Sequence, residues 1–213
     1  FIREDKLMVF FDQDRWLSDN GDYTLRLNYP LNSDSVVVDL GGYRGDFANN
    51  IHSKFNCNVY VFEPFKDFYN VIEGRFRSNE KIKVFNYGIS NKTLSQDFHF
   101  SNDGSALASV QRFSEEDNKP VSRVEVRSFK DVYEELNFDT IDLLKINVEG
   151  SEYEILENIF ENNYTTKIKN FQIQFHPEPP GAEEAYERIS KVLSKTHNLD
   201  WHYQWVWENW SLR

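Results

Sequence analysis

Short apolar runs recur along this chain, and amphipathic stretches separate them. Runs of β-branched and apolar residues are typical of strands that are covered on both faces of a parallel sheet. Five such runs predict five core strands. They are Val36–Leu40, Asn58–Phe62, Ile82–Phe85, Ile141–Ile146 and Phe171–Phe175.

Between these runs, apolar residues return every three or four positions, which is the spacing of one helix face. The predicted helices cover Phe47–Phe55, Phe65–Phe76, Ser128–Leu136, Ser151–Ile159 and Glu183–Lys195. Strands and helices therefore alternate along the chain. This order predicts an α/β fold with a mostly parallel, doubly wound sheet.

Strict alternation of apolar and polar residues marks a different kind of strand, with one face in water. Leu94–Phe100 and Arg123–Arg127 alternate in this way and predict an antiparallel insertion between the third and fourth core strands. Trp201–Trp210 predicts one C-terminal antiparallel strand. Ahead of the core, Lys6–Trp16 predicts a helix and Asp22–Leu27 a short strand.

The length of 213 residues suits one domain with an ample core. We expect a flanking segment over residues 1–33, a cofactor-binding core over 34–177, and a C-terminal helix with an aromatic strand over 178–213. The start of the chain at Phe1 is also compatible with a domain excised from a longer protein.

A formal net charge of −11 argues against nucleic acid or an anionic membrane as a partner, because phosphate binding normally needs clustered Lys and Arg. No apolar run approaches the length of a membrane span, and no signal peptide is visible. We therefore expect a cytoplasmic location. Cys57 is the only cysteine, which excludes an intrachain disulfide and a thiolate metal cluster.

A glycine-rich bend follows the first core strand. Its spacing is Asp39-x-Gly41-x-x-x-Gly45, whereas a dinucleotide fingerprint needs G-x-G-x-x-G. The observed spacing is that of the first motif of class I S-adenosylmethionine-dependent methyltransferases. The helix behind the bend would point its N-terminus at the ligand.

Glu63 ends the second core strand, 24 positions after Asp39. An acid in this place can accept hydrogen bonds from both ribose hydroxyls of an adenosyl group. The alternative is a helix-capping or solvated carboxylate. The end of the third strand should lie near the adenine. The predicted cofactor-binding residues are Asp39, Gly41, Gly42, Tyr43, Gly45, Glu63, Pro64, Asn86, Tyr87, Gly88 and Asn147.

Candidate catalytic residues follow the fourth and fifth strands, because ligands bind at the carboxyl ends of the strands in doubly wound sheets. Asn147 and Glu149 follow the fourth strand, and His176 follows the fifth. An imidazole with an ordinary pKa near 6.5 is well suited to act as a general base. Glu149 is a second candidate base, or it anchors its loop by accepting backbone N–H bonds.

Three motifs together resemble the FkbM family of O-methyltransferases. They are residues 38–45, the sequence Val61-Phe62-Glu63-Pro64, and residues 142–152, in which Leu-Leu-Lys-Ile-Asn-Val-Glu-Gly-Ser-Glu is the most specific part. The resemblance covers roughly residues 34–177. It implies a Rossmann-like class I methyltransferase fold, S-adenosylmethionine as the methyl donor, and a sugar hydroxyl of a glycan, glycolipid or natural product as the acceptor.

The chain departs from the family at Asn147, where the family usually has Asp. A neutral amide is a poor metal ligand and cannot act as a base at ordinary pH, so we expect no metal requirement. A weak magnesium site formed by Glu149, Asp142 and His176 remains an alternative. We expect Lys145, inside an apolar strand, to form a structural ion pair.

The aromatic tail has two interpretations. Trp201, Trp205, Trp207 and Trp210 could stack against the C–H face of a sugar, or they could form edge-strand core or a dimer contact. A homodimer and attachment to glycosyltransferase domains are both compatible with the sequence. The alternative functions are a non-catalytic adenosyl- or glycan-binding module of the same fold and, less favoured by the glycine spacing, an NAD-dependent oxidoreductase.

Overall fold

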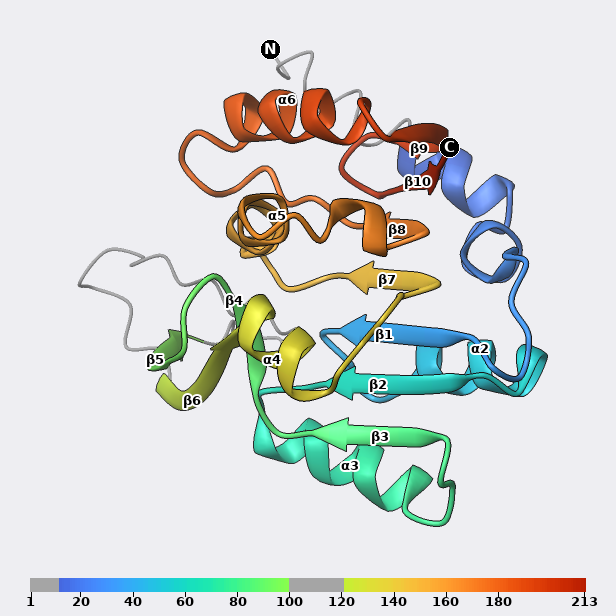
Figure 1. Cartoon of the computed structure of the whole chain (residues 1–213), viewed down its shortest axis with the longest axis vertical. Helices are drawn as coiled ribbons and strands as arrows, with labels where there is room; N and C mark the ends of the chain where they lie inside the picture. Colours follow the sequence, from blue (N-terminus) through green and yellow to red (C-terminus); the bar gives the residue numbers. More distant parts are fainter. Residues whose placement is uncertain (1–11, 100–120) are drawn as a thin grey trace.

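The computed structural model describes residues 12–99 and 121–213 of the chain. A seven-stranded sheet runs through this part in the order β3-β2-β1-β7-β8-β10-β9 (Figure 1). The strands β3, β2, β1, β7 and β8 pair in parallel, and β10 runs antiparallel to both of its neighbours. The strand bounds are β1 Val36–Leu40, β2 Asn58–Phe62, β3 Ile82–Phe85, β7 Leu143–Ile146, β8 Asn170–Ile173, β9 His197–Tyr203 and β10 Trp207–Leu212.

A second, three-stranded sheet lies beside the carboxyl end of β3 and has the order β4-β6-β5. Its strands are β4 Gly88–Ser90, β5 Leu94–His99 and β6 Val121–Ser128. The predicted antiparallel insertion is present, because β5 and β6 pair in antiparallel fashion. The short strand β4 follows β3 and pairs with β6 in parallel.

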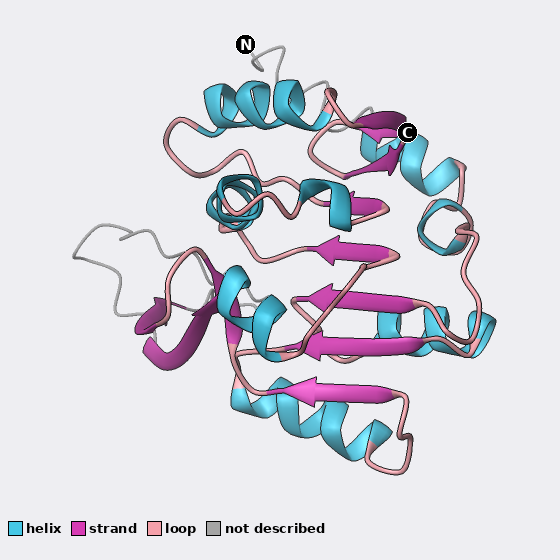
Figure 2. Cartoon of the chain, in the orientation of Figure 1, coloured by secondary structure: helices cyan, strands magenta, loops and turns pink. Residues whose placement is uncertain are grey.

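Helices cover both faces of the main sheet (Figure 2). Their bounds are α2 Asp46–Phe55, α3 Lys66–Phe76, α4 Phe129–Glu135, α5 Glu152–Glu161 and α6 Ala182–Leu193, with short 3-10 turns η1 Leu25–Leu27 and η2 Thr165–Lys167. One apolar cluster joins the sheet to α4, α5 and α6. A second joins the opposite face to α2, α3 and the segment around Leu27 and Tyr29. Among the described residues, no helix is long and apolar enough to cross a membrane.

The segment ahead of β1 is not the short strand that the alternation over Asp22–Leu27 predicts. Residues 12–18 are helical, turns follow, and Leu25 to Leu27 form a 3-10 turn. The Thr24 hydroxyl donates to the carbonyls of Asp19 and Asn20, so a side chain closes the turn in place of a strand ladder. Residues 6–11 of the predicted helix lie outside the described residues.

The aromatic tail forms a hairpin of β9 and β10, so the prediction of one strand over Trp201–Trp210 was wrong. Trp205 takes a left-handed backbone with φ +59°, and the Gln204 N–H donates to Asp12 at 2.7 Å, which fixes the turn between the strands. Trp210 is buried in the main core, and Trp207 packs in a smaller cluster with Trp16 and Tyr203. Most of the aromatic row therefore serves packing.

Candidate functional site

The glycine-rich bend lies at the carboxyl end of β1 and leads directly into α2. Gly41 has φ +82°, and a Cβ built there would lie 1.9 Å from the carbonyl oxygen of Asn147. Only glycine fits this backbone and this contact. The N–H groups of Gly41 and Gly42 both donate to the carbonyl of Phe62, at 3.0 and 3.2 Å. The bend is therefore held tightly between β2 and the segment that follows β7.

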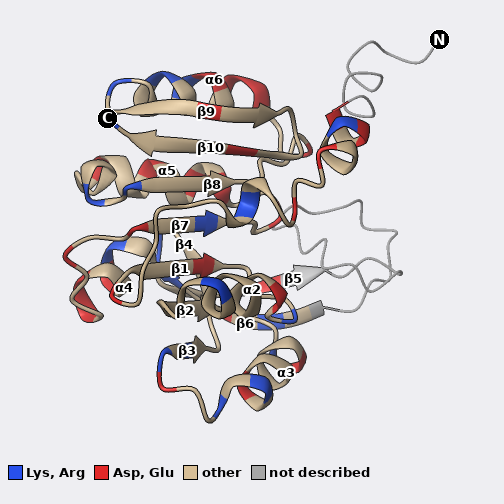
Figure 3. Cartoon of the chain, turned by 90° about the vertical axis from the view of Figure 1, so that its right-hand side faces the viewer, with Lys and Arg blue, Asp and Glu red and all other residues tan. Residues whose placement is uncertain are grey.

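Lys145, on the neighbouring strand β7, binds the backbone of the bend. Its ammonium group donates to the carbonyl of Gly41 at 2.7 Å and to that of Leu40 at 3.2 Å, and it forms an ion pair with Asp39 at 2.8 Å. The two side chains are 4% and 0% exposed. In Figure 3 the blue segment of β7 and the red segment of β1 mark this pair. The structural ion pair predicted for Lys145 is confirmed.

Asp39 is fully buried and pairs with Lys145, and its predicted contact with the cofactor stays a prediction. Burial lowers the pKa of Lys145, while the charge of Asp39 opposes that shift. The pair therefore balances the cost of removing two charges from water against their mutual attraction.

A cavity of about 350 Å³ opens beside the bend. Its walls come from the bend and α2 on one side, the η1 segment on another, and the ends of β7, β8 and β10. The lining residues are Asp22, Tyr23, Arg26, Leu27, Gly41, Gly42, Tyr43, Arg44, Asp46, Phe47, Asn50, Lys145, Asn147, Gln174 and Trp207. The cavity thus lies at the carboxyl edge of the sheet, where the doubly wound topology predicts a ligand.

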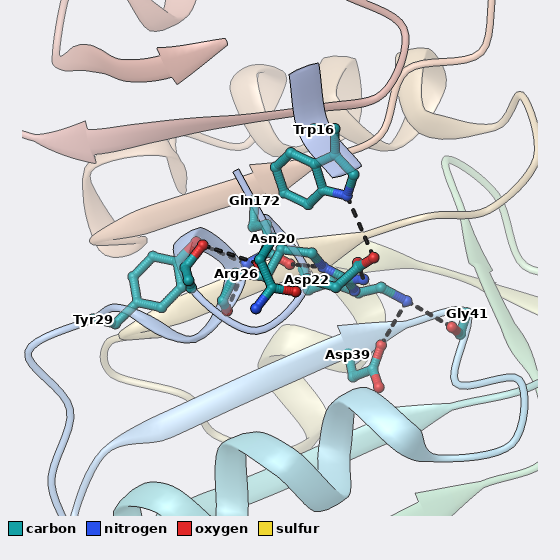
Figure 4. Close-up of polar contacts among 10 residues, drawn as sticks. Trp16, Asn20, Asp22, Arg26, Tyr29, Asp39, Gly41 and Gln172 are labelled. Atoms are coloured by element: carbon teal, nitrogen blue, oxygen red, sulfur yellow. Dashed lines mark hydrogen bonds and ion pairs between the residues drawn. The ribbon is translucent and has the colours of Figure 1, made fainter. Parts of the chain in front are cut away.

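Arg26 is a lining residue that the sequence did not reveal. Its Nε donates to Gln172 at 3.0 Å and its Nη1 to Asp22 at 2.8 Å, as Figure 4 shows. Its guanidinium carbon lies 4.0 Å from the centre of the Trp207 ring. No motif marks Arg26, because it belongs to an irregular segment more than a hundred residues away from the strands that it contacts.

Glu63 follows β2 and is 3% exposed. Its two carboxylate oxygens accept hydrogen bonds from the backbone N–H groups of Tyr43 at 2.8 Å and Phe65 at 2.9 Å. Burial raises the pKa of Glu63 to about 7, although these two hydrogen bonds oppose the shift. Each oxygen keeps a lone pair for a hydroxyl donor, so the geometry is compatible with the predicted ribose contact.

The residues predicted near the adenine have different surroundings. The Asn86 side chain donates to the carbonyls of Glu63 at 3.1 Å and Pro64 at 3.0 Å, which shapes the turn after β2. A Cβ at Gly88 would lie 3.5 Å from Pro64, so these two residues touch. Tyr87 packs against Phe62 with ring centres 5.5 Å apart. These residues therefore pack around the turn after β2, where Glu63 lies.

Asn147 lines the cavity directly after β7. Its backbone N–H donates to the carbonyl of Leu40 at 3.1 Å, and its carbonyl presses against Gly41. Its side-chain oxygen Oδ1 is buried and has no hydrogen-bond donor among the described residues. A buried acceptor without a donor is costly, and this atom is closed off from the cavity that the residue lines.

His176 and Glu149 contact each other, but neither residue lines the cavity. The imidazole contacts Glu149 at 3.3 Å through Nε2 and Glu152 at 2.9 Å through Nδ1. Burial favours the neutral ring, but the hydrogen bonds and charges of the two carboxylates outweigh it and raise the pKa of His176 to about 10. At neutral pH the ring already carries the proton that a general base would have to accept.

Glu152 takes the anchoring function suggested for Glu149. It is fully buried and accepts the backbone N–H groups of Val148 and Gly150, both at 3.0 Å. Glu149 itself has φ +55°, a left-handed conformation that costs a non-glycine residue about 1–2 kcal/mol.

Asp142 lies at the other end of β7, where it accepts from the Val36 N–H and from Lys169, both at 2.8 Å. Asp142 therefore does not join Glu149 and His176, so the three residues considered for a magnesium site do not come together. At the start of α5, Ser151 makes no side-chain cap. Glu154, in the first turn, accepts a hydrogen bond from Ser90 at 3.1 Å.

The comparisons with known proteins agree with this geometry. The family model described as "Methyltransferase FkbM domain" matches residues 39–200. No curated protein matches the sequence. An rRNA methylase from Streptococcus thermophilus is similar in structure, with a TM-score of 0.50 at 10% identity over 91% of this chain and 93% of that one. A chain of the fibrillarin/Nop5p complex gives 0.52 at 12% identity over 92% and 81%. The class I methyltransferase fold is confirmed.

Proposed function

Because the chain belongs to the FkbM methyltransferase family, we propose that it transfers a methyl group from S-adenosylmethionine to a hydroxyl of a sugar in a glycan, glycolipid or glycosylated natural product. S-adenosylmethionine, when bound, supplies a methyl group that its sulfonium already activates. The protein therefore needs to align the acceptor oxygen with that methyl group and to receive one proton.

The residues present fit this cofactor. The bend at Gly41 allows close backbone approach, and Glu63 offers carboxylate oxygens to the ribose hydroxyls. The cavity beside the bend is lined by Asn147, which directly follows β7. We assign the adenosyl part to the Glu63 side of the bend and the amino-acid part to the cavity.

The sugar acceptor rests on one observation, the mixed lining of the cavity. The lining combines aromatic rings with amide side chains: the rings are Tyr23, Tyr43, Phe47 and Trp207, and the amides are Asn50, Asn147 and Gln174. Tyr23 is 68% exposed, so its ring is available as a platform near the opening. Aromatic faces suit the C–H surface of a sugar, and planar amides suit its hydroxyls.

The proton acceptor is the open step in this proposal. The raised pKa of His176 keeps its ring protonated at neutral pH, so the ring cannot act as the base. If the base comes from the turn after β7, it is Glu149, the carboxylate that contacts His176. Asp22 and Asp46 are the carboxylates of the cavity lining, and each already pairs with an arginine. Methyl transfer by Glu149→Gln and Asp22→Asn, each at saturating cofactor, would identify which carboxylate receives the proton.

The test of the function is transfer of labelled methyl groups from S-adenosylmethionine to a panel of sugars and glycans, with ribosomal RNA and protein as competing acceptors. A methyl ether on a sugar survives mild alkali, whereas a methyl ester on a carboxylate is hydrolysed. Alkali-stable label on a sugar supports the proposal. Label found only on RNA or protein would overturn the acceptor class and leave the methyltransferase assignment intact.

Cofactor binding is tested separately by calorimetry with S-adenosylhomocysteine, with NAD as the control ligand. We expect binding of the adenosyl thioether alone, and weaker binding by Glu63→Ala. Binding of NAD in its place would favour the oxidoreductase alternative.

A further inference from the structure

A second cavity, of about 490 Å³, borders the η1 turn, and the proposed methyl transfer makes no use of it. Leu25 of this turn lines the second cavity, whereas Arg26 and Leu27 line the cavity beside the bend. The hairpin of β9 and β10 and the start of β8 form other walls, so we call it the hairpin cavity. The η1 turn is therefore a wall of both cavities.

A β-bulge in the hairpin places an acid in this second cavity. The ladder pairs Asn209 with Trp201 and shifts its register at the next residue, which leaves Asp200 as the extra residue. The Asp200 carboxylate accepts hydrogen bonds from the Asn209 amide and the Ser211 hydroxyl, both at 2.8 Å. Each carboxylate oxygen keeps a lone pair for a further donor. Bulges commonly redirect a side chain beside a functional site, and this one is held by the facing strand.

A directed chain of hydrogen bonds fixes this carboxylate from behind. Arg26 can only donate, and its Nε binds the Gln172 side-chain oxygen at 3.0 Å (Figure 4). The Gln172 amide nitrogen therefore donates to the Tyr29 hydroxyl at 2.7 Å, and that hydroxyl donates to Asn209 at 3.0 Å. Asn209 is 2% exposed and consequently turns its amide nitrogen to Asp200. The acceptor is thus preorganised, which lowers the cost of binding a ligand.

The remaining lining indicates which ligand suits this acceptor. Trp201 lines the hairpin cavity next to Asp200 and is half-buried. An indole face packs well against the C–H surface of a sugar, and a carboxylate with two free acceptor positions suits adjacent hydroxyls. Among the described residues of the lining, the charged groups are Asp200 and Lys169, whose formal charges cancel. The lining therefore favours a neutral polyhydroxylated ligand over an ion.

We propose that the hairpin cavity binds a neutral sugar unit, with Asp200 accepting hydrogen bonds from two adjacent hydroxyls and Trp201 contacting the C–H face. The site holds the sugar and does no chemistry on it. This inference goes beyond the proposed function, because it concerns a sugar that is not itself methylated and holds whichever acceptor receives the methyl group.

The experiment follows the indole N–H signals of the protein by two-dimensional NMR. The chain has five tryptophans, of which Trp201 lines the hairpin cavity and Trp207 the cavity beside the bend. Trp201→Phe and Trp207→Phe identify the two signals. The probes are the methyl glycosides of glucose, galactose, mannose and rhamnose, with choline as a cationic probe. We expect at least one glycoside to shift the Trp201 signal in a saturable way, and choline to leave it unchanged.

Asp200→Asn keeps the shape of the side chain but removes its charge, and we expect it to weaken glycoside binding roughly 10-fold. Ser211→Ala removes one of the two bonds that orient Asp200, so we expect a loss of roughly threefold. Asp139→Asn is the matched control, because it removes the same charge from a side chain that is 96% exposed and lines neither cavity. It should change binding by less than about twofold.

The site is overturned if no glycoside shifts the Trp201 signal, or if choline shifts it in place of the glycosides. An Asp139→Asn loss as large as that of Asp200→Asn would reduce the effect to general electrostatics and overturn it too. If Asp200→Asn does not fold, unchanged binding by Ser211→Ala overturns it. Shifts of the Trp207 signal alone would place the sugar beside the bend and overturn the second site. Failure of the proposed function looks different, since it appears in the methyl-transfer assay and leaves the Trp201 shifts in place.

Discussion

The buried ion pair between Asp39 and Lys145 yields a prediction that separates stability from cofactor binding. The two charges lie 2.8 Å apart, and neither is more than 4% exposed. Burial lowers the pKa of Lys145, and the attraction of Asp39 opposes this shift only in part. For a buried ion pair, the cost of desolvation offsets much of the mutual attraction. The pair as a whole should contribute little, whereas either charge alone should be costly.

The perturbation is Lys145→Met, alone and together with Asp39→Leu. The single change leaves a buried carboxylate without its partner, which costs roughly 3–5 kcal/mol in the free energy of unfolding. For a chain of this length, that loss lowers the melting temperature by roughly 6–20 °C. The double change removes both charges, and we expect its stability to return to wild type or to exceed it by roughly 1–4 kcal/mol.

Cofactor affinity should not recover with stability. Both variants lose the hydrogen bond from Lys145 to the Gly41 carbonyl, which holds the bend that the cofactor approaches. The assay is urea unfolding followed by tryptophan fluorescence, with S-adenosylhomocysteine binding measured on the same samples. We expect the double variant to be stable and to bind weakly.

Lys169→Met is the matched control. Lys169 pairs with Asp142 at the same 2.8 Å, but its side chain is 54% exposed. An exposed pair should contribute less than about 1 kcal/mol. The reasoning is refuted if Lys145→Met is as mild as Lys169→Met, or if the double variant is as unstable as the single one.

Three further predictions concern backbone and protonation. Gly41→Ala should lower the free energy of unfolding by roughly 2–5 kcal/mol, because the backbone is left-handed there and the new Cβ would clash with Asn147. Gly74 lies in open space within α3, so Gly74→Ala should raise the free energy of unfolding by roughly 0.5–1 kcal/mol. Denaturant titration compares the two variants. Because the pKa of Glu63 is raised to about 7, S-adenosylhomocysteine should bind more tightly as pH rises from 6 to 8, and a Glu63→Gln profile that kept this slope would contradict the ribose contact. Because the pKa of His176 is raised to about 10, its stabilising effect should be complete below its unfolded value near 6.5 and lost as pH rises toward 10. Unfolding at pH 7 and pH 9.5 should show this loss for wild type and a smaller one for His176→Phe.

Periodicity and motif spacing predicted the main sheet because its strands are covered on both faces, which forces near-continuous apolar runs. Val36–Leu40 and Asn58–Phe62 match their predicted bounds. The tail could not be resolved in this way, because the turn at Trp205 contains neither glycine nor proline and the aromatic alternation continues across it. A hydrogen bond to Asp12, nearly two hundred residues away, fixes that turn.

The candidate site was predicted as far as it lies on regular elements. The bend at Gly41, the acid Glu63 and Asn147 each follow a core strand, and parallel topology brings such positions to one edge. Arg26 belongs to a 3-10 turn whose place depends on tertiary contacts with Gln172 and Trp207. Local sequence carries no signal for such contacts, so the part of the cavity wall that this segment forms could not be foreseen.

The turn after β7 shows why a motif alone does not assign a task to each of its residues. Glu149 and Glu152 are both acids of one short motif, and sequence alone cannot tell which turns inward. Two backbone N–H groups and an imidazole converge on Glu152, which is completely buried. The left-handed backbone at Glu149 turns the first acid toward the other face of the same imidazole. The ring is thereby held as a cation between two carboxylates, so a base at this turn would have to be Glu149, accepting a proton from the side that His176 does not occupy.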